Sequence, residues 1–519
     1  MLYYTVMKKL FKILTNKIAV TAFFFIVQVA FTVVLLLSLS SLSAWVYLAF
    51  SLFSLFVCLF IMGKDANPGY KLAWVIPILL LPLFGGMMYL SFGRTARLRR
   101  KDRKRLERIA GETVRAQDEA REASLRFLPA FSEPRRKLAR LISDLGYCPP
   151  YDHTGVTYYP SGEDFLQALL ADLQQAERYI FMEYFIIERG KCWNAVLDVL
   201  QQKAAQGVDV RILYDDFGCL LTLPGNYPKK LKAMGIKVHV FNKIKPTFNI
   251  RMNNRTHRKI AVIDGRIAYT GGLNLADEYI NAVDKFGHWK DTAVRLCGNA
   301  AQSFTVMFLQ FWMLLEKEYL PAGDYLPALT HESATEDNGY VQPIASYPDQ
   351  NLQVIEKALM EMVHTADRYV YINTPYLIPD NEFVTALCLA AQSGVDVRIT
   401  MPHIPDKRIV FMMSRSFYPV LLKAGVKIYE YLPGFVHAKS MLCDDSVAYV
   451  GTCNLDYRSF YLHYECGAIL YDVPALADMK SDYLATLENC KQITYEEATD
   501  VRAVTKLARS VLRLFAPLM

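Results

Sequence analysis

One eight-residue motif occurs twice in the chain, and this repeat decides the interpretation of the rest. The stretch 257–264 reads His-Arg-Lys-Ile-Ala-Val-Ile-Asp, and the stretch 437–444 reads His-Ala-Lys-Ser-Met-Leu-Cys-Asp. Both have the form His-x-Lys-x4-Asp, and their apolar run predicts a buried strand. Because residues i and i+2 of a strand share a face, each histidine should point into a site together with its lysine. The aspartates should fall at the strand ends.

The sequence around the motif repeats in the same order. Ala-Glu-Arg-Tyr-Ile at 176–180 is echoed by Ala-Asp-Arg-Tyr-Val at 366–370, and Gly-Val-Asp-Val-Arg-Ile occurs both at 207–212 and at 394–399. Such repetition indicates an internal duplication. In the first copy we expect strands at 179–185, 208–214, 237–241 and 259–263, and helices at 164–175 and 194–205. The fold class that follows is α/β, with two pseudo-symmetric halves that have mixed sheets and form one catalytic unit.

Further polar residues repeat downstream of each histidine. Asn274 and Asn454 each lie 17 residues after their histidine. An acid follows in each half, Asp291 in the first and Glu465 in the second. Two copies with matching spacing are far harder to obtain by chance than a single His-x-Lys pair, so we interpret the set as functional.

This set of side chains suits phosphodiester chemistry. Two ammonium groups and two amides can neutralise and hold the phosphoryl oxygens. One imidazole can attack phosphorus, while the other protonates the leaving alkoxide and then takes a proton from the acceptor. A carboxylate on each imidazole fixes its tautomer. We expect no metal and no cofactor, because the ten cysteines form no Cys-x-x-Cys pair and no zinc-site spacing.

The N-terminal region is strongly apolar. Residues 18–39 and 44–62 are uncharged and long enough to cross a bilayer, so we expect a helical hairpin connected at 40–43. A signal peptide is the alternative for the first segment, but the second run follows it at once. A third apolar stretch, 72–92, is interrupted by prolines and glycines, so it either spans or is re-entrant.

Basic residues flank these apolar segments. The run 94–108 holds nine basic and two acidic residues, and the N-terminus is also basic. Both ends should therefore lie in the cytoplasm, which predicts a multi-pass cell-membrane protein with a cytoplasmic catalytic part. The run suits anionic headgroups or is a solvated linker helix. We expect no nucleic-acid partner, because the chain has no recognised nucleic-acid module.

These patterns predict the division of the chain. The expected parts are a membrane anchor (1–93), a basic linker helix (94–130), a first half (131–325), a linker (326–345) and a second half (346–519). A helix at 506–519 would have an apolar face containing Leu507, Val511 and Leu514. That helix either lies at the membrane interface or is buried.

The two motif copies resemble the phospholipase D superfamily, and the resemblance runs from about residue 150 to the end. Within this superfamily, the chain resembles the bacterial cardiolipin synthase branch. The features that carry this closer resemblance are the apolar hairpin, the interrupted third segment, and the stretches 67–69, 373–376 and 401–407. The superfamily often has Gly-Ser after the motif. This chain has Gly271-Gly272 and Gly451-Thr452 instead, which puts the serine's hydrogen bond in question in the first half.

The resemblance implies a role for each motif residue. His257 would attack phosphorus, and His437 would act as general acid and then as general base. Glu465 would pair with His257 and Asp291 with His437, across the halves. Phosphoryl oxygens would be bound by Lys259, Lys439, Asn274 and Asn454. Asp264 and Asp444 would orient the site.

The implied reaction is phosphatidyl transfer between two phosphatidylglycerol molecules. It would give cardiolipin and glycerol through a phosphohistidine intermediate, at an anionic membrane surface. Another transphosphatidylase or a phospholipase D hydrolase of the same superfamily is the alternative enzyme. A lipid-binding scaffold is the alternative from another class, but it should have lost a histidine or lysine, and both halves are intact. The sequence indicates no oligomeric state.

Overall fold

The computed structural model describes residues 41–93, 100–243, 254–317, 319–330, 339–348 and 352–518, together with 26 and 30. Its contacts divide the chain into two units. The first comprises Met1–Arg97, Lys243–Asn254 and Ser510–Met519. The second comprises Leu98–Asn242 and Arg255–Arg509, and both motif copies belong to it.

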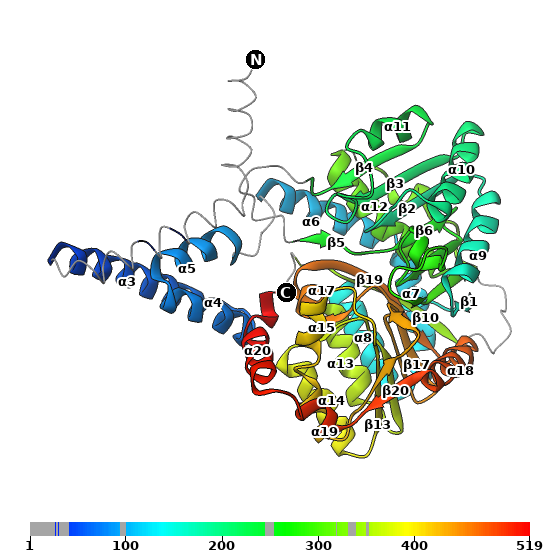
Figure 1. The fold of residues 1–519 in the computed structure, drawn as a ribbon. Coiled ribbons are helices and arrows are strands. Elements are labelled where there is room, and N and C mark those ends of the chain that lie inside the picture. The colour runs from blue at the N-terminus through cyan, green and yellow to red at the C-terminus, as the bar shows by residue number, and fades with distance from the viewer. Residues whose placement is uncertain are drawn as a thin grey trace. The chain divides into compact units, whose positions relative to one another are not determined.

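The first half of the second unit is built on a seven-stranded mixed sheet (Figure 1). In spatial order its strands are β1 (Thr154–Tyr159), β9 (Ala293–Gly298), β7 (Ile267–Gly271), β6 (Ile260–Ile263), β2 (Tyr179–Tyr184), β3 (Asp209–Asp215) and β4 (Lys237–Phe241). Strands β2, β3 and β4 are parallel, and the other neighbours are antiparallel. The central strands are buried along their length, in line with their continuous apolar runs.

The second half repeats this order strand for strand. In spatial order its strands are β10 (Tyr340–Ser346), β19 (His463–Tyr471), β17 (Val447–Gly451), β16 (Ser440–Cys443), β11 (Tyr369–Asn373), β13 (Asp396–Pro402), β14 (Lys427–Tyr431) and β20 (Cys490–Ile493). Its ninth strand, β5 (Arg255–Thr256), comes from the first half of the chain and pairs with β19. The predicted α/β fold with two similar halves and mixed sheets is therefore confirmed.

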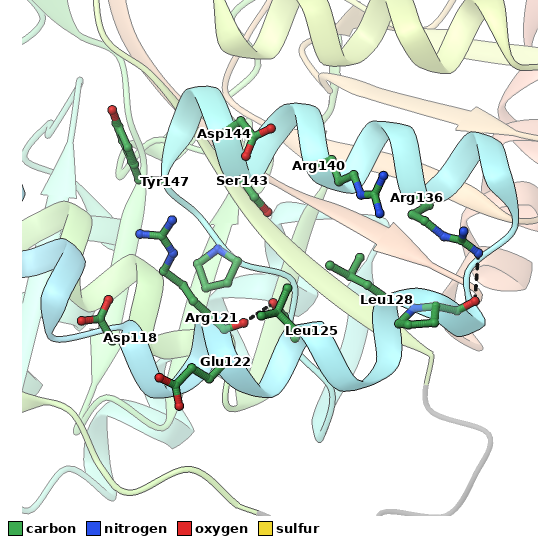
Figure 2. A pocket seen from close by; sticks show the side chains of 13 residues that line it. Asp118, Arg121, Glu122, Leu125, Leu128, Arg136, Arg140, Ser143, Asp144 and Tyr147 are labelled. Carbon is green, nitrogen blue, oxygen red and sulfur yellow. Dashed lines mark hydrogen bonds between the residues drawn. The ribbon is translucent and has the colours of Figure 1, made fainter.

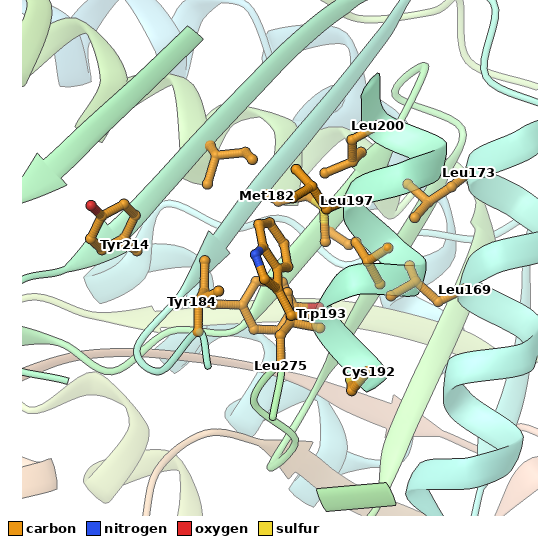
Figure 3. Packing of buried hydrophobic residues seen from close by; sticks show 14 of the residues in the cluster. Leu169, Leu173, Met182, Tyr184, Cys192, Trp193, Leu197, Leu200, Tyr214 and Leu275 are labelled. Atoms are coloured by element: carbon orange, nitrogen blue, oxygen red, sulfur yellow. The ribbon is translucent and has the colours of Figure 1, made fainter. Parts of the chain in front are cut away.

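Helices complete the core of each half. In the first half, α9 (Gly162–Gln174) and α10 (Lys191–Ala205) supply apolar faces that pack with β2 and β3 around Trp193 (Figure 3). Trp193 is fully buried, and its indole N–H donates to the Tyr227 hydroxyl at 2.5 Å. In the second half, α13 (Val354–His364) and α14 (Asn381–Gln392) have the corresponding places in the chain order.

The helix α12 (Ala301–Glu316) is apolar on almost every side and is buried for most of its length. It contacts strands of the first sheet as well as β10 of the second. A helix that is hydrophobic all round is expected only inside a core. This helix therefore joins the two halves into one unit.

Residues 100–146 form three helices, α6 (Arg100–Arg115), α7 (Asp118–Phe127) and α8 (Glu133–Gly146). The expectation of one continuous linker helix at 94–130 fails at Gln117, which is buried and donates a hydrogen bond to Tyr151 at 2.8 Å. Helix α8 packs on α13 and β10 of the second half. The Gln342 side chain secures this contact by donating to the Ala139 carbonyl at 3.0 Å.

The strand β10 begins at Tyr340, inside the range expected to be a linker between the halves. Together with α8, it shows that the sequence boundaries do not follow the packing. The partners of β10 and α8 lie far away in the chain, so no local sequence pattern reveals them.

The N-terminal helices form a separate apolar cluster. They are α3 (Ser41–Met62), α4 (Pro68–Leu80), α5 (Pro82–Met88) and the π-helical turn η1 (Tyr89–Gly93). Among the described residues, Trp45–Met62 is the one stretch long and apolar enough to cross a membrane. The predicted segment 18–39 lies outside the described residues except for Ile26 and Ala30.

Two details of this region differ from expectation. Residues 41–43, expected to connect two spans, already belong to α3. The third apolar segment is divided at Leu81, because Pro82 starts a new helix. A side chain at Gly85 would lie 2.5 Å from the Ile78 backbone, so α5 packs closely against α4. Whether this segment spans the bilayer or is re-entrant stays a prediction.

Shorter elements make up the remainder. They are α11 (Tyr227–Ala233), α15 (Arg408–Ser414), α16 (Tyr418–Lys423), α17 (Tyr457–Tyr461), α18 (Ala475–Glu488), α19 (Tyr495–Thr499), α20 (Ala503–Leu514), β8 (His288–Lys290), β12 (Leu377–Ile378), β15 (Gly434–Val436), β18 (Leu455–Asp456), and the short turns η2 (Leu128–Ala130), η4 (Asp277–Ile280), η5 (Ala322–Tyr325) and η6 (Ala516–Leu518). Helix α20 has no buried residue, whereas Ala516 directly after it is buried, so both alternatives for 506–519 stay predictions.

Candidate active site

Two short parallel strand pairs bring the halves together at the motif. Strand β5, directly before His257, pairs with β19 of the second half. Strand β15, directly before His437, pairs with β8 of the first half. The pairing continues one residue further, because the His257 amide donates to the Tyr464 carbonyl at 2.9 Å and the His437 amide to the Lys290 carbonyl at 2.7 Å. Each histidine is thereby placed beside the acid of the opposite half.

Each imidazole is bonded to that acid. The Nδ1 atom of His257 lies 2.9 and 3.0 Å from the two carboxylate oxygens of Glu465. The Nδ1 atom of His437 lies 2.7 Å from Asp291 Oδ2. All four residues are buried. A carboxylate on Nδ1 directs the proton to that nitrogen and leaves Nε2 as the reactive atom. This is the crossed pairing that the resemblance implies.

The histidines and lysines do not lie on a strand, contrary to expectation. Residues 257–259 and 437–439 are extended stretches between two strands, β5 and β6 in the first half and β15 and β16 in the second. Their backbone leaves one sheet to pair with the other half. The Lys259 ammonium donates to the His257 carbonyl at 2.7 Å, and Lys439 makes the same bond to His437.

Both lysines are buried and carry pKa values below the ordinary value. Burial lowers the pKa of Lys259 to about 8, against the opposing effect of Glu465 and Asp291. Burial lowers the pKa of Lys439 to about 7, with Lys259 adding to the shift. The two ammonium groups therefore repel each other in a poorly solvated site, and a bound anion would relieve both effects.

In the empty site both imidazoles are held neutral. Burial lowers the pKa of His257 well below its usual value, and the charges of Lys259 and Lys439 lower it further. Burial and Lys439 lower the pKa of His437 to about 4, despite Asp291. Although burial alone would raise it, the pKa of Asp291 is lowered, because His437 and Lys439 stabilise its charge. An unprotonated imidazole is the form required of a nucleophile.

Asn274 is partly engaged by hydrogen bonds within the protein. Asn274 accepts the Ile186 amide at 3.0 Å and donates to the Tyr279 hydroxyl at 2.7 Å. Asn274 and Asn454 are both buried. One N–H of Asn274 remains for a ligand, since an amide group has two donors.

The motif aspartates lie at the far end of β6 and β16 from the histidines. Asp264 accepts the amides of Glu177, Arg178 and Tyr179 at 2.7–2.8 Å. Asp444 accepts the amides of residues 367–369 at 2.6–2.8 Å. Each carboxylate thus caps the entry to the neighbouring strand, β2 or β11, and the structure does not bring it to the histidines.

Aromatic neighbours that the sequence analysis did not single out surround each imidazole. His463 lies 5.4 Å from the His257 ring, and Trp289 lies 5.3 Å from the His437 ring, measured between ring centroids. These two residues have equivalent positions, two residues before Glu465 and Asp291 respectively. Burial lowers the pKa of His463 to about 3. Their equal spacing from the acids could have identified these two residues. The repeat did not reveal them, because one is a histidine and the other a tryptophan.

The residues after the motif explain the missing serine. In the second half, the Thr452 hydroxyl donates to Glu465 and so makes the hydrogen bond that a serine at this position would make. In the first half, a Cβ atom at Gly272 would lie 2.0 Å from Asp291 Oδ1. That oxygen accepts the Thr292 amide at 2.8 Å instead. Glycine is therefore needed there, because the carboxylate occupies the space of a side chain.

Among the described residues, one group of side chains is close enough to hold a metal ion. Its members are His257, His463 and Glu465, whose donor atoms all lie within 4.8 Å of one another. Two of them already form the His257–Glu465 pair, so an ion there would compete with that hydrogen bond.

A surface groove of about 540 Å³ lies away from these residues, between α7 and α8 (Figure 2). It is lined by three arginines and three acids, namely Arg121, Arg136, Arg140, Asp118, Glu122 and Asp144. Its charges balance, so it offers no net attraction for an anionic headgroup.

The comparisons with known proteins agree with this geometry. The family described as cardiolipin synthase, PLD-like domain, matches residues 169–312 and 359–486, and the phospholipase D-nuclease N-terminal family matches 49–94. A cardiolipin synthase of Geobacillus kaustophilus is 37% identical over 90% of this chain and 92% of its own length. One from Alkalihalophilus pseudofirmus is 35% identical over 97% of this chain and 100% of its own.

A solved structure shares the fold. The phosphatidylserine synthase of Haemophilus influenzae superposes with a TM-score of 0.56 at 15% identity, covering 74% of this chain and 98% of that one. At this identity the likeness concerns the fold alone.

Proposed function

The chain belongs to the cardiolipin synthases with phospholipase D-like domains, and we propose that it joins two phosphatidylglycerol molecules into cardiolipin. One phosphatidylglycerol donates its phosphatidyl group and loses its headgroup glycerol. The other accepts that group on its headgroup hydroxyl.

The first half-reaction forms a covalent enzyme. The Nε2 atom of His257 attacks phosphorus, and the bond between phosphorus and the headgroup glycerol breaks. The negative charge of the bound phosphodiester offsets the charges of Lys259 and Lys439, so His437 can carry a proton, which it gives to glycerol as glycerol leaves. Lys259 and Lys439 balance the charge on the phosphoryl oxygens. A phosphatidyl group now rests on His257, and His437 is neutral.

The second half-reaction reverses these roles. The hydroxyl of a second phosphatidylglycerol gives its proton to His437 and attacks phosphorus, and the bond to His257 breaks. Cardiolipin leaves, and His437 is protonated again. One phosphodiester has replaced another, so the reaction needs no energy source. Exclusion of water favours transfer over hydrolysis.

One observation carries this proposal. Two buried histidines each bond through Nδ1 to an acid of the opposite half, and two buried lysines accompany them. A nucleophile and a proton shuttle in one site require this duplication. A scaffold that only bound lipid would not need two oriented imidazoles.

Product analysis tests the proposal directly. Purified protein in phosphatidylglycerol vesicles, without added metal, should release glycerol and accumulate cardiolipin in equal amounts. The His257→Ala variant should form neither. Phosphatidic acid without cardiolipin would indicate a hydrolase, and the synthase assignment would then be wrong although the two-histidine chemistry stood.

We also propose that the protein crosses the cell membrane more than once and that its catalytic part faces the cytoplasm. The basic residues flanking the apolar segments support this orientation. Cys297 provides a test, because it is the exposed member of ten free cysteines. A membrane-impermeant maleimide should label Cys297 in permeabilised cells but not in intact ones, and Cys297→Ser should remove the signal. Labelling of intact cells would contradict the cytoplasmic orientation.

A further inference from the structure

A short loop beside the nucleophile exposes large apolar side chains. It follows β3, and it leaves Phe217 56%, Leu220 53% and Leu221 96% exposed to solvent. Single exposed leucines are common and need no explanation. Three large apolar side chains within five residues form a cluster instead, and such clusters mark interaction surfaces.

This loop is held in a defined shape. The Asp215 carboxylate accepts the Phe217 amide at 2.8 Å, and the Thr222 hydroxyl donates to the Ile187 carbonyl at 2.6 Å. The Cys219 thiol is buried and accepts the Ile187 amide at 3.2 Å. The exposed side chains therefore project from an ordered base.

The same base supports His257. The other oxygen of Asp215 accepts the amide of Thr256, the residue before the nucleophile, at 3.1 Å. Gly218 packs so closely on the Phe185 carbonyl that a Cβ atom would lie 2.0 Å from it. The Phe185 ring lies 5.2 Å from the His257 ring. Only one layer of residues separates the apolar loop from the nucleophile.

The second half has a matching feature after β13, the equivalent of β3. Ile404 is 37% and Ile409 57% exposed. The Ile404 amide donates to the carbonyl of Gly434, in the strand that leads to His437, at 3.4 Å. Lys407 and Arg408 extend from the same segment and are exposed, and Lys407 pairs with the less exposed Asp406 at 3.5 Å, so the segment 404–409 keeps one net positive charge. The apolar side chains are thus accompanied by a cation, which suits an anionic lipid.

We propose that these two rim loops, 217–221 and 404–409, insert into an anionic leaflet and form the entrance through which lipid phosphodiesters reach the two histidines. This inference rests on the proposed function, because it takes the substrate to be a lipid drawn from a bilayer. Inserted apolar side chains would lower the barrier to lifting a lipid headgroup towards the site. They would also keep water away from the phosphatidyl enzyme.

Two substrate forms test the role of the loops. The full chain in phosphatidylcholine nanodiscs would receive phosphatidylglycerol either as a long-chain lipid in the disc or as short-chain monomers in solution. Leu220→Ser/Leu221→Ser should lower the rate on long-chain lipid about tenfold and leave the rate on monomers unchanged. The control Leu389→Ser, on α14 and 55% exposed, should change neither rate. Equal rates on long-chain lipid, or equal losses on both forms, would overturn the proposal.

A spectroscopic measurement separates this proposal from the catalytic one. Leu221→Trp in nanodiscs with brominated acyl chains should lose the emission that it adds to the five native tryptophans. Leu389→Trp should keep its added emission. Quenching needs no turnover, so it would support the loops even if no cardiolipin formed. Unquenched emission from residue 221 would refute insertion even in an active enzyme.

Discussion

At the scale of single residues, the site separates two histidines that the repeat makes look equivalent. His257 lies beside His463, whereas His437 lies beside Trp289. Glu465 bonds to His257 through two oxygens and is held by Thr452, while Asp291 bonds to His437 through one. Such differences allow one imidazole to act as the nucleophile and the other as the proton shuttle.

A substrate with a good leaving group can assign these roles. A phosphatidyl ester of p-nitrophenol needs no proton donor to lose its phenolate. His437→Ala should therefore release about one equivalent of nitrophenolate in a burst and retain a phosphatidyl group on His257, because the acceptor is no longer deprotonated. Mass spectrometry of the quenched protein would locate that group. His257→Ala should show no burst, and a burst with label on His437 would exchange the two roles.

The lysines predict an alkaline limit to activity. The pKa values of about 7 for Lys439 and about 8 for Lys259 mean that the empty site loses its cations as pH rises through this range. Below it, both ammonium groups are present and attract the phosphodiester. The ratio kcat/KM for phosphatidylglycerol should therefore fall between pH 7 and pH 9. A bound anion stabilises both charges, so kcat should fall at a higher pH than kcat/KM.

An arginine variant provides the control for the predicted fall of kcat/KM at alkaline pH. A guanidinium stays charged throughout the range, so Lys439→Arg should lose much of the alkaline fall even if its maximal rate is lower. A kcat/KM that keeps rising to pH 9 in the wild type would show that these lysines do not bind the substrate as cations.

Most of the candidate site residues could be predicted from the sequence, because the same residue types recur at the same spacing in both halves. It did not reveal His463, since the equivalent residue is Trp289 and no repeated pattern marks the pair. It also did not explain Gly272, because the reason for a glycine there is the position of Asp291 in space.

At the scale of elements, the duplicated strands were predictable and the crossing strands were not. Continuous apolar runs identified β2, β3, β4 and β6 to within a residue or two. The strands β5 and β15 have only two and three residues, and their partners belong to the opposite half. No local pattern announces such pairing, so the histidines were assigned to a strand that in fact begins three residues later.

The motif aspartates belong to this scale, because each organises the start of a strand. Asp264→Asn replaces an accepting oxygen with a donor that faces a backbone N–H. We expect this change to lower the free energy of unfolding by about 2 kcal/mol, measured as a fall in Tm in detergent. The control Asp445→Asn, whose ion pairs are exposed, should cost less than about 1 kcal/mol.

The activity of the same variant distinguishes two roles for the aspartate. If Asp264 only shapes the sheet, the folded Asp264→Asn protein should retain most of its kcat below its Tm. A loss of about a hundredfold in kcat with an unchanged Tm would instead place this carboxylate in the chemistry.

At the scale of the whole catalytic unit, neither half holds a complete site. Each supplies one histidine, one lysine and the acid for the other half's histidine, so activity depends on how the halves are held together. The sequence indicated this arrangement through the duplication. It could not indicate that α8 would pack on the second half or that α12 would lie between the halves, because these contacts join residues far apart in the chain.

A partly buried ion pair across the halves supports the strand that leads to Asp291. The Lys290 ammonium of β8 donates to Asp482 of α18 and to the Pro160 carbonyl, both at 2.6 Å. The other oxygen of Asp482 accepts the Tyr158 hydroxyl at 2.7 Å. Lys290 precedes Asp291, and its own carbonyl holds the His437 amide. The pair therefore joins α18 of one half to the strand that orients His437.

Removing one partner should damage both stability and catalysis. Asp482→Ala leaves the Lys290 charge buried and unpaired, which should cost about 3–5 kcal/mol in Tm and chemical denaturation measurements. Displacement of β8 would also move Asp291, so kcat of the folded enzyme should fall about tenfold or more.

The double variant Lys290→Met/Asp482→Leu should regain much of the stability, because it removes the unpaired charge. Breaking the exposed Lys491–Glu497 pair through Lys491→Ala should change stability by less than about 1 kcal/mol and leave kcat unaltered. If Asp482→Ala behaved like Lys491→Ala, the alignment of the halves would have to reside in the strand pairs β5–β19 and β8–β15 alone.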